Sequence, residues 1–263
     1  MVFRLRMCEQ PLGEIFMSRS RSGFYSAIEY IGPRPQKPKR RNFFGGWVIG
    51  VIAVGIACWF GRPLLQTLKG QEGASSERAT MLISALKTSG TPGNQLAAAA
   101  LGHSSDKVVF DPSYYKISYP NGDVSPGKGA AADVIIRCYR KLNLDLQKEV
   151  HEDMVANFRH YPQLWGNTTP DTNIDHRRIA NLQRFFERKG KTLPLSRDPQ
   201  DFHPGDVVIW SLANADSHIG IVVPGPGAAG GEPWVVHNMG DGVKWEDVLF
   251  DYKIEAHFRY PEN

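Results

Sequence analysis

Three short apolar runs near the C-terminus constrain the fold of this chain most strongly. They are DVVIW at 206–210, HIGIVV at 218–223 and PWVVHN at 233–238, and a further run lies near AHFRY at 256–260. Each is rich in β-branched and aromatic residues and is bounded by Gly, Pro, Asn or Asp, a pattern typical of β-strands. Because the connections between the first three are short, we expect them to pair as antiparallel neighbours.

Helical patterns precede these strands along the chain. The strongest covers residues 130–142, where apolar side chains recur at 131, 134, 135, 138 and 142, the spacing of one helix face. Other helices are expected at 94–102, near 144–160 and near 175–190. Helices followed by an antiparallel sheet predict an α+β domain in which the helices pack on the sheet.

The N-terminal part has a different character. Residues 43–61 carry no charge, and residues 1–42 contain nine Arg or Lys and three Glu, a net charge of +6. Nineteen helical residues approach the roughly 30 Å of a bilayer core, and basic residues flank the cytoplasmic side of such spans. The pattern predicts one transmembrane helix at 43–61; the alternative is a buried helix of a soluble protein.

This interpretation divides the chain into four parts. Residues 1–42 are expected to be a disordered basic tail in the cytoplasm. Residues 62–92 are expected to be a linker with a short helix at about 75–88. Residues 93–263 then form the domain outside the membrane.

The charge and the cysteines narrow the possible partners. The whole chain has a net charge of +4, so the part after residue 42 has 4 − 6 = −2. That value gives no electrostatic reason to expect nucleic acid as a partner. Cys8, Cys58 and Cys138 fall in the tail, the span and the domain, so no disulfide within the chain is expected.

Two histidines stand at the ends of the predicted strands, His218 at the start of one and His237 near the end of the next. One imidazole on such a strand can reach into a cleft, and the second can bind its other ring nitrogen and orient it. Asn238 is the alternative orienting residue. Such a pair suits a cysteine nucleophile placed at a helix N-terminus, where the helix dipole stabilises a thiolate.

These segments also resemble a known family. FDPSYYKISYPNGDV, DLQKEVHEDM, PDTNIDHRRIANLQRFF, HIGIVV and VVHNMG resemble, in this order, the bacterial YijF-like family of domains of unknown function. PGDVVIW, HIGIVV and WVVHNMG also resemble the second half of NlpC-type papain-like cysteine peptidases, which cleave peptidoglycan stem peptides. The resemblance implies a papain-like fold, His218 as general base and His237 as its orienting partner.

The resemblance also locates the nucleophile position. In relatives the helix begins Gly-x-Cys-x-Asp, whereas here Gly129 is followed by Ala130, Ala131, Ala132 and Asp133. Ala131 therefore occupies the cysteine position and has no atom that can act as a nucleophile. The alanine is either a deliberate Cys-to-Ala substitution or natural, in which case the domain is a pseudoenzyme. Cys138 does not replace it, because it lies about two helical turns further on and is expected to pack in the core.

Further site residues are expected around this position. The resemblance implies that Tyr114 or Tyr115 donates a hydroxyl to an oxyanion. Arg177 or Arg178 is a candidate to hold a carboxylate of a stem peptide. Asp133 is expected to stabilise the helix start.

The segment around Asp171, Asp175 and His176 matches no standard zinc spacing, so no metal and no cofactor are expected. Asp175 is predicted to cap a helix, with His176–Arg178 on its polar face.

Two functional hypotheses follow from the sequence. The first is a cysteine amidase or peptidase of the bacterial envelope, anchored in the inner membrane, facing the periplasm, acting on peptidoglycan peptides and inactive with Ala131. The second is a non-catalytic envelope module that binds through the same groove.

Overall fold

The computed structural model describes residues 50–51, 54, 76–227 and 232–261. The chain divides into two compact units, Met1–Ile56 and Ala57–Asn263. In the first unit the described residues 50, 51 and 54 are helical. The predicted membrane span at 43–61 lies almost wholly outside the described residues, and among those described no helix is long and apolar enough to cross a membrane.

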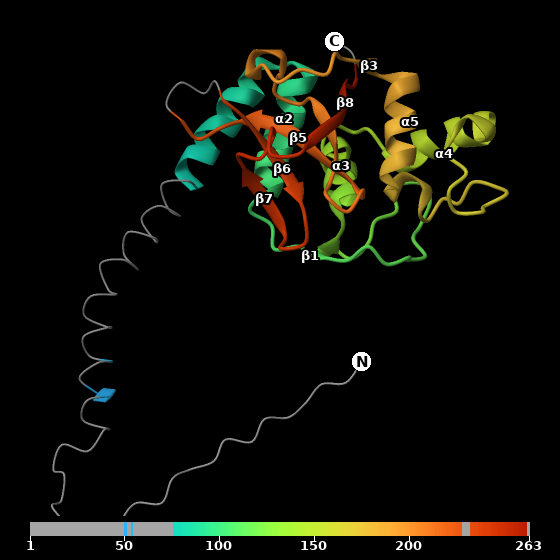
Figure 1. Cartoon of the computed structure of the whole chain (residues 1–263), viewed down its shortest axis with the longest axis horizontal. Coiled ribbons are helices and arrows are strands. Elements are labelled where there is room, and N and C mark those ends of the chain that lie inside the picture. The colour runs from blue at the N-terminus through green and yellow to red at the C-terminus, as the bar shows by residue number, and fades with distance from the viewer. Residues whose placement is uncertain (1–49, 52–53, 55–75, 228–231, 262–263) are drawn as a thin grey trace, which may run out of the picture. The chain divides into compact units, whose positions relative to one another are not determined.

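The second unit is an α+β domain, as the sequence predicts, with helices preceding an antiparallel sheet (Figure 1). Residues 76–89 are helical. The further helices are α2 (Pro92–His103), α3 (Ala131–Arg140), α4 (Leu146–Asn157) and α5 (Ile179–Lys189), with 3-10 turns η1 (Phe158–His160), η2 (Asp175–Arg177) and η3 (Pro199–Asp201). The strands are β1 (Val109–Phe110), β2 (Lys128–Gly129), β3 (Lys191–Thr192), β4 (Val207–Ser211), β5 (Ser217–Pro224), β6 (Pro233–Asn238), β7 (Val243–Glu246) and β8 (Lys253–Arg259).

The main sheet has the strand order β3-β8-β4-β5-β6-β7, and all of its neighbours are antiparallel. The four predicted strands are therefore present as β4, β5, β6 and β8. The short strand β3, the strand β7 and the small parallel pair β1–β2 that leads into α3 were not predicted from the sequence. Since β5 and β6 are antiparallel, the start of β5 and the end of β6 lie at the same end of the sheet.

Local signals fix the helix starts. Thr91 Oγ1 accepts a hydrogen bond from the Asn94 amide at the start of α2, with Pro92 in the first turn. Asp145 does the same for α4 through the Gln147 amide. Both are standard N-caps that satisfy amides left free in the first helical turn.

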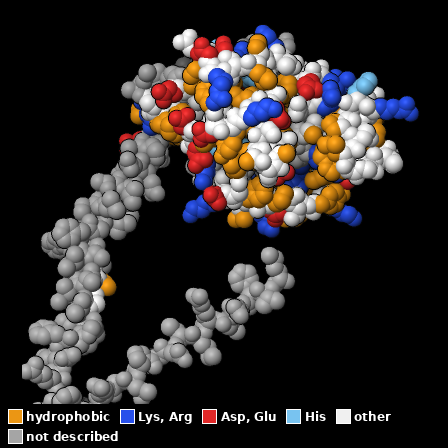
Figure 2. Space-filling view, viewed as in Figure 1, with side chains coloured by type: hydrophobic (Ala, Val, Ile, Leu, Met, Phe, Trp, Pro, Cys, Tyr) orange, Lys and Arg blue, Asp and Glu red, His pale blue; other side chains and the backbone are white. Residues whose placement is uncertain are grey.

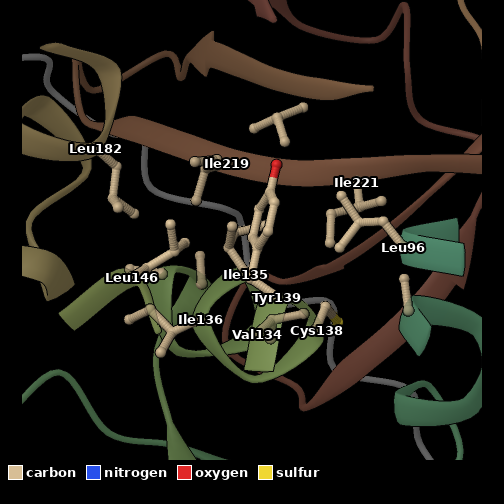
Figure 3. Packing of buried hydrophobic residues seen from close by; sticks show 14 of the residues in the cluster. Leu96, Val134, Ile135, Ile136, Cys138, Tyr139, Leu146, Leu182, Ile219 and Ile221 are labelled. Carbon is tan, nitrogen blue, oxygen red and sulfur yellow. The ribbon is translucent and has the colours of Figure 1, made fainter. Parts of the chain in front are cut away.

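The larger core lies between the sheet and the helices α2, α3 and α5. Its centre is Tyr139 of α3, which is fully buried beside Ile135 and Ile219 (Figure 3). The Tyr139 hydroxyl donates to the Tyr260 carbonyl at 2.8 Å, so its polar atom is satisfied inside the core. We call this cluster the helix-side core.

The opposite face of the sheet carries a second, smaller cluster, which we call the outer-face core. Its buried members are Phe202, Val208, Trp210, Val222, Val235 and Leu249. Side chains alternate along a strand, so every second residue of β5 and β6 belongs to each face. Both faces of the central strands are therefore buried, which explains why these runs are continuously apolar.

On the face of the molecule that Figure 2 shows, basic and acidic side chains are interspersed with apolar ones. On this face, side chains of one charge sign do not gather into an extended patch.

Candidate active site

His218 and His237 lie side by side on the neighbouring strands β5 and β6. His218 Nε2 is 3.0 Å from His237 Nδ1, and the two rings are nearly perpendicular, at 83°. Both residues are buried, with 5% and 2% of their surface exposed. The structure thus brings together the two histidines that the sequence predicted, in direct hydrogen bond.

Glu246 extends the pair toward the surface. It lies on β7, and its Oε2 atom is 3.3 Å from His237 Nε2. The Glu246 side chain is 39% exposed, and Lys244 Nζ lies 3.6 Å from its other oxygen. Glu246 could not be recognised in the sequence without β7; the GDG turn after PWVVHN is the signal for a further hairpin strand.

Trp210 packs against His218 from β4. The two rings are stacked, with centroids 5.8 Å apart and an angle of 26° between their planes. The indole Nε1 donates to the Leu249 carbonyl at 2.9 Å, which fixes the ring. The orientation of His218 is thus restricted by an aromatic plane and by His237.

Burial makes both histidines weak bases. It lowers the pKa of His218 to about 4, helped by the neighbouring His237. Burial also lowers the pKa of His237, although the Glu246 carboxylate opposes that shift. Near neutral pH the pair is therefore uncharged, and one ring must donate the shared hydrogen bond while the other accepts it.

The turn into α3 is held by a second network of buried charges. Gly129 has φ +155°, and a Cβ there would lie 2.9 Å from Asp133 Cβ, so only glycine fits without strain. The Asp133 carboxylate accepts from the Ala130 amide at 2.6 Å and pairs with Arg177 at 2.8 Å. Asp133 thus stabilises the helix start, as predicted.

Ala131 is the first residue of α3 and is 4% exposed. Its closest link to the histidines runs through Asn238, whose side-chain amide donates to the Gly129 carbonyl at 3.2 Å. Asn238 follows His237 directly, so the start of α3 is fixed to the strand end that carries the pair. Asn238 therefore positions the α3 turn, and in the described part of the chain its side chain forms no hydrogen bond with either imidazole.

Ala131 and the histidine pair lie on opposite faces of the main sheet. Ala131 belongs to the helix-side core together with Ile219 and Val236. His218 and His237 alternate with these residues and so point to the face of Trp210. The turn before Ala131 is therefore linked to the pair at the end of β6, through Asn238 and its neighbour His237.

The tyrosines expected to bind an oxyanion are engaged elsewhere. The Tyr114 hydroxyl donates to Asp171 at 3.1 Å, and the Tyr115 hydroxyl donates to Asp111 at 2.6 Å. The bond from Tyr115 lowers the pKa of Asp111, which also pairs with Lys128. Both hydroxyl protons are thus held by carboxylates.

Arg177, the expected carboxylate ligand, is also occupied. It is buried, and besides Asp133 its guanidinium donates to the Ser113 and Asp111 carbonyls. Arg177 therefore fastens the segment 111–115 to the start of α3. The alternative, Arg178, lies over the Trp165 ring at 4.1 Å and pairs with Asp175.

The segment after Asp171 differs partly from its prediction. Asp175 accepts a hydrogen bond from the Asp171 amide, so it closes a local turn at η2 rather than capping α5. The expectation of a polar helix face at 176–178 is wrong for two residues, because His176 and Arg177 are buried. Burial lowers the pKa of His176 to about 4. The described residues contain no group of three side chains arranged to hold a metal ion.

A cavity of about 670 Å³ lies away from the histidines, between residues 76–89, α2 and the C-terminal half of α3. Cys138 lines it but is almost fully buried, and burial raises the pKa of its thiol to about 12. Thiolate is the reactive form of cysteine, so this side chain is inert in the folded protein. Cys138 thus packs as a core thiol.

Comparison with known proteins places the chain in a family. Residues 97–260 match the family described as a domain of unknown function, DUF1287. The chain belongs to this family. The YijF-like membership expected from the motifs is confirmed: YijF of Escherichia coli (strain K12), an uncharacterized protein, is 48% identical over 153 residues, covering 58% of this chain and 74% of that protein.

A solved structure is also similar to this DUF1287 chain. NlpC1 from Trichomonas vaginalis shares 16% identity, with a TM-score of 0.33, over 63% of this chain and 44% of that one. The chain thus spans less than half of that protein. The NlpC-type relation continues to rest on the sequence motifs around the histidines.

Proposed function

We propose that this domain is the scaffold of a cysteine amidase or peptidase of the bacterial envelope, in which position 131 is the nucleophile position. One observation supports the proposal most: a buried, hydrogen-bonded histidine pair lies at the strand end that Asn238 fastens to the turn before Ala131. A histidine pair near a helix N-terminus is suited to proton transfer to and from a nucleophile at that helix start.

Four groups of the protein would take part in the reaction. With a cysteine at position 131, His218 would take the thiol proton and the thiolate would add to an amide carbonyl carbon, while His237 orients His218. The amide C–N bond would then break, the amine would leave with the proton from His218, and water would hydrolyse the thioester. Free amides in the first turn of α3 would stabilise the oxyanion. With Ala131 the chain has no thiol at this position and is expected to bind substrate without turnover.

The substrate class and the location are parts of the same proposal. Peptidoglycan stem peptides are proposed because the motifs resemble those of NlpC-type enzymes. Anchoring in the inner membrane is proposed from the uncharged residues 43–61 and the basic tail before them.

The experiment is to restore the cysteine. The variant A131C is incubated with muropeptides, and products and acyl-enzyme are followed by mass spectrometry, with the double variant A131C/H218A as control. Hydrolysis or an acyl-enzyme that depends on His218 supports the proposal. If correctly folded A131C gives neither product with any wall fragment, the hydrolase proposal fails.

Ala131 itself favours a second candidate, a non-catalytic module that binds wall fragments at the same place. The parent chain would then bind muropeptides, H218A would leave that binding intact, and the bulky variant A131W would abolish it. Isothermal titration of the three chains separates this candidate from a trapped enzyme, in which H218A weakens binding.

A further inference from the structure

We propose that Glu246 sets the direction of the hydrogen bonds through His237 to His218, so that His218 Nδ1 carries the free lone pair. Glu246 would be a positioning residue, since it touches neither substrate nor position 131. The inference rests on the proposed function for its catalytic meaning.

The direction follows from what a carboxylate can do. An ionised Glu246 only accepts hydrogen bonds, so the contact at 3.3 Å requires His237 Nε2 to carry the hydrogen. A neutral imidazole has one N–H, and His237 Nδ1 is then an acceptor.

The same rule applies to the next contact. Because His237 Nδ1 accepts, the hydrogen in the 3.0 Å contact must come from His218 Nε2. His218 Nδ1 is then unprotonated. Among the described residues it has no hydrogen-bond partner, yet it is not one of the polar atoms sealed from solvent. This is the state that a general base needs at the open end of β5 and β6.

Nothing else among the described contacts fixes this direction. The stacking of Trp210 on His218 does not select which ring nitrogen of His218 carries the hydrogen. Lys244 is the other charged side chain recorded at Glu246, and its bond to Asp241 at 3.4 Å holds it in place. Its ammonium group only donates hydrogen bonds, so the carboxylate accepts from Lys244 as well as from His237.

Replacing Glu246 by Gln removes the preference while keeping the shape. A glutamine amide can donate to His237 Nε2 as well as accept from it. The reversed arrangement puts the hydrogen on His218 Nδ1 and removes the base. We expect E246Q to raise the fraction of the Nδ1–H form of His218 about fivefold, the effect of one hydrogen bond of ordinary strength at a half-exposed site.

The test reads the two rings directly by NMR. The full chain is labelled with 15N-histidine, the ring signals are assigned with H218Q and H237Q, and long-range 1H–15N spectra report which nitrogen carries hydrogen. The parent should show both rings in the Nε2–H form. E246Q should shift His218 toward Nδ1–H, E246D should restore the parent pattern, and E255Q, at an exposed glutamate on β8, is the matched control.

Two results overturn the inference: a parent His218 that is already Nδ1–H, or an E246Q spectrum identical to that of the parent. These outcomes are separable from failure of the proposed function, because the spectra need no substrate and no cysteine. If A131C does turn over substrate, adding E246Q should lower kcat in proportion to the loss of the unprotonated-Nδ1 form that the spectra measure, and leave KM unchanged.

Discussion

The buried histidines predict that mild acid destabilises this domain. Burial holds the pKa of His218 at about 4, below the value near 6.5 of an exposed imidazole. Between pH 6.5 and pH 4 the unfolded chain binds a proton at this side chain that the folded chain does not. Stability is therefore lost as the pH falls through this window, and it is unaffected by this group above it.

The size of the effect follows from the two pKa values. Moving from pH 7 to pH 5 removes about 2 kcal/mol of unfolding free energy for one histidine with such a shift. His176, which burial also holds at a pKa of about 4, contributes a similar amount. Together they amount to about 4 kcal/mol, a large share of the 5–15 kcal/mol typical of a domain.

The assay is urea unfolding of the full chain at pH 7 and pH 5, followed by tryptophan fluorescence. The variant H218Q keeps a polar side chain but cannot titrate, so its loss on acidification should be smaller than that of the parent by about 2 kcal/mol. H160Q changes an exposed histidine and is the control. If H218Q and the parent lose equal stability between the two pH values, His218 is not a buried neutral imidazole and the reasoning is refuted.

Two further predictions concern the surroundings of position 131. D133N leaves the buried Arg177 without its counter-ion and should reduce the unfolding free energy by about 3–5 kcal/mol. The control D241N, at a side chain 85% exposed, should change the unfolding free energy by less than about 0.5 kcal/mol. Urea unfolding at pH 7 measures both variants, and a loss below about 1 kcal/mol for D133N contradicts a tight buried pair. Cys138, with a pKa of about 12, should resist iodoacetamide at pH 8 in the folded chain and react after unfolding. Peptide mass mapping would show this difference, and rapid labelling of Cys138 in the folded protein contradicts its burial.

The sequence predicted the main strands and α3 because their patterns are strong and local. The β-branched run at 218–223 and the helical spacing from 131 to 142 each indicate one structure. The antiparallel pairing of β4, β5 and β6 could be predicted because the segments that connect these strands are short. The strand β7 was missed because VKWE is short and carries two charged residues.

The roles of the charged residues could not be predicted in the same way. Arg177 and His176 were placed on a polar face because single sequences show charge but not burial. Arg177 is buried because Asp133, 44 positions earlier in the chain, supplies a carboxylate for it. Tyr115 likewise looked free in the sequence, whereas Asp111 holds its hydroxyl. Such long-range pairs depend on how α3 and η2 pack together, which no local pattern contains.

The histidine pair is poorly explained as a purely structural feature. Each buried imidazole lowers the stability of the fold in mild acid, and apolar side chains of similar size would pack beside Trp210 without that penalty. The pair also leaves His218 Nδ1 without a partner, although the rest of the ring is enclosed. That atom is not sealed from solvent, so it can accept a hydrogen bond from water or from a bound group. His218 Nδ1 lies at the strand end that Asn238 fastens to the turn before Ala131, and it is the atom that a ligand or a reacting group would contact.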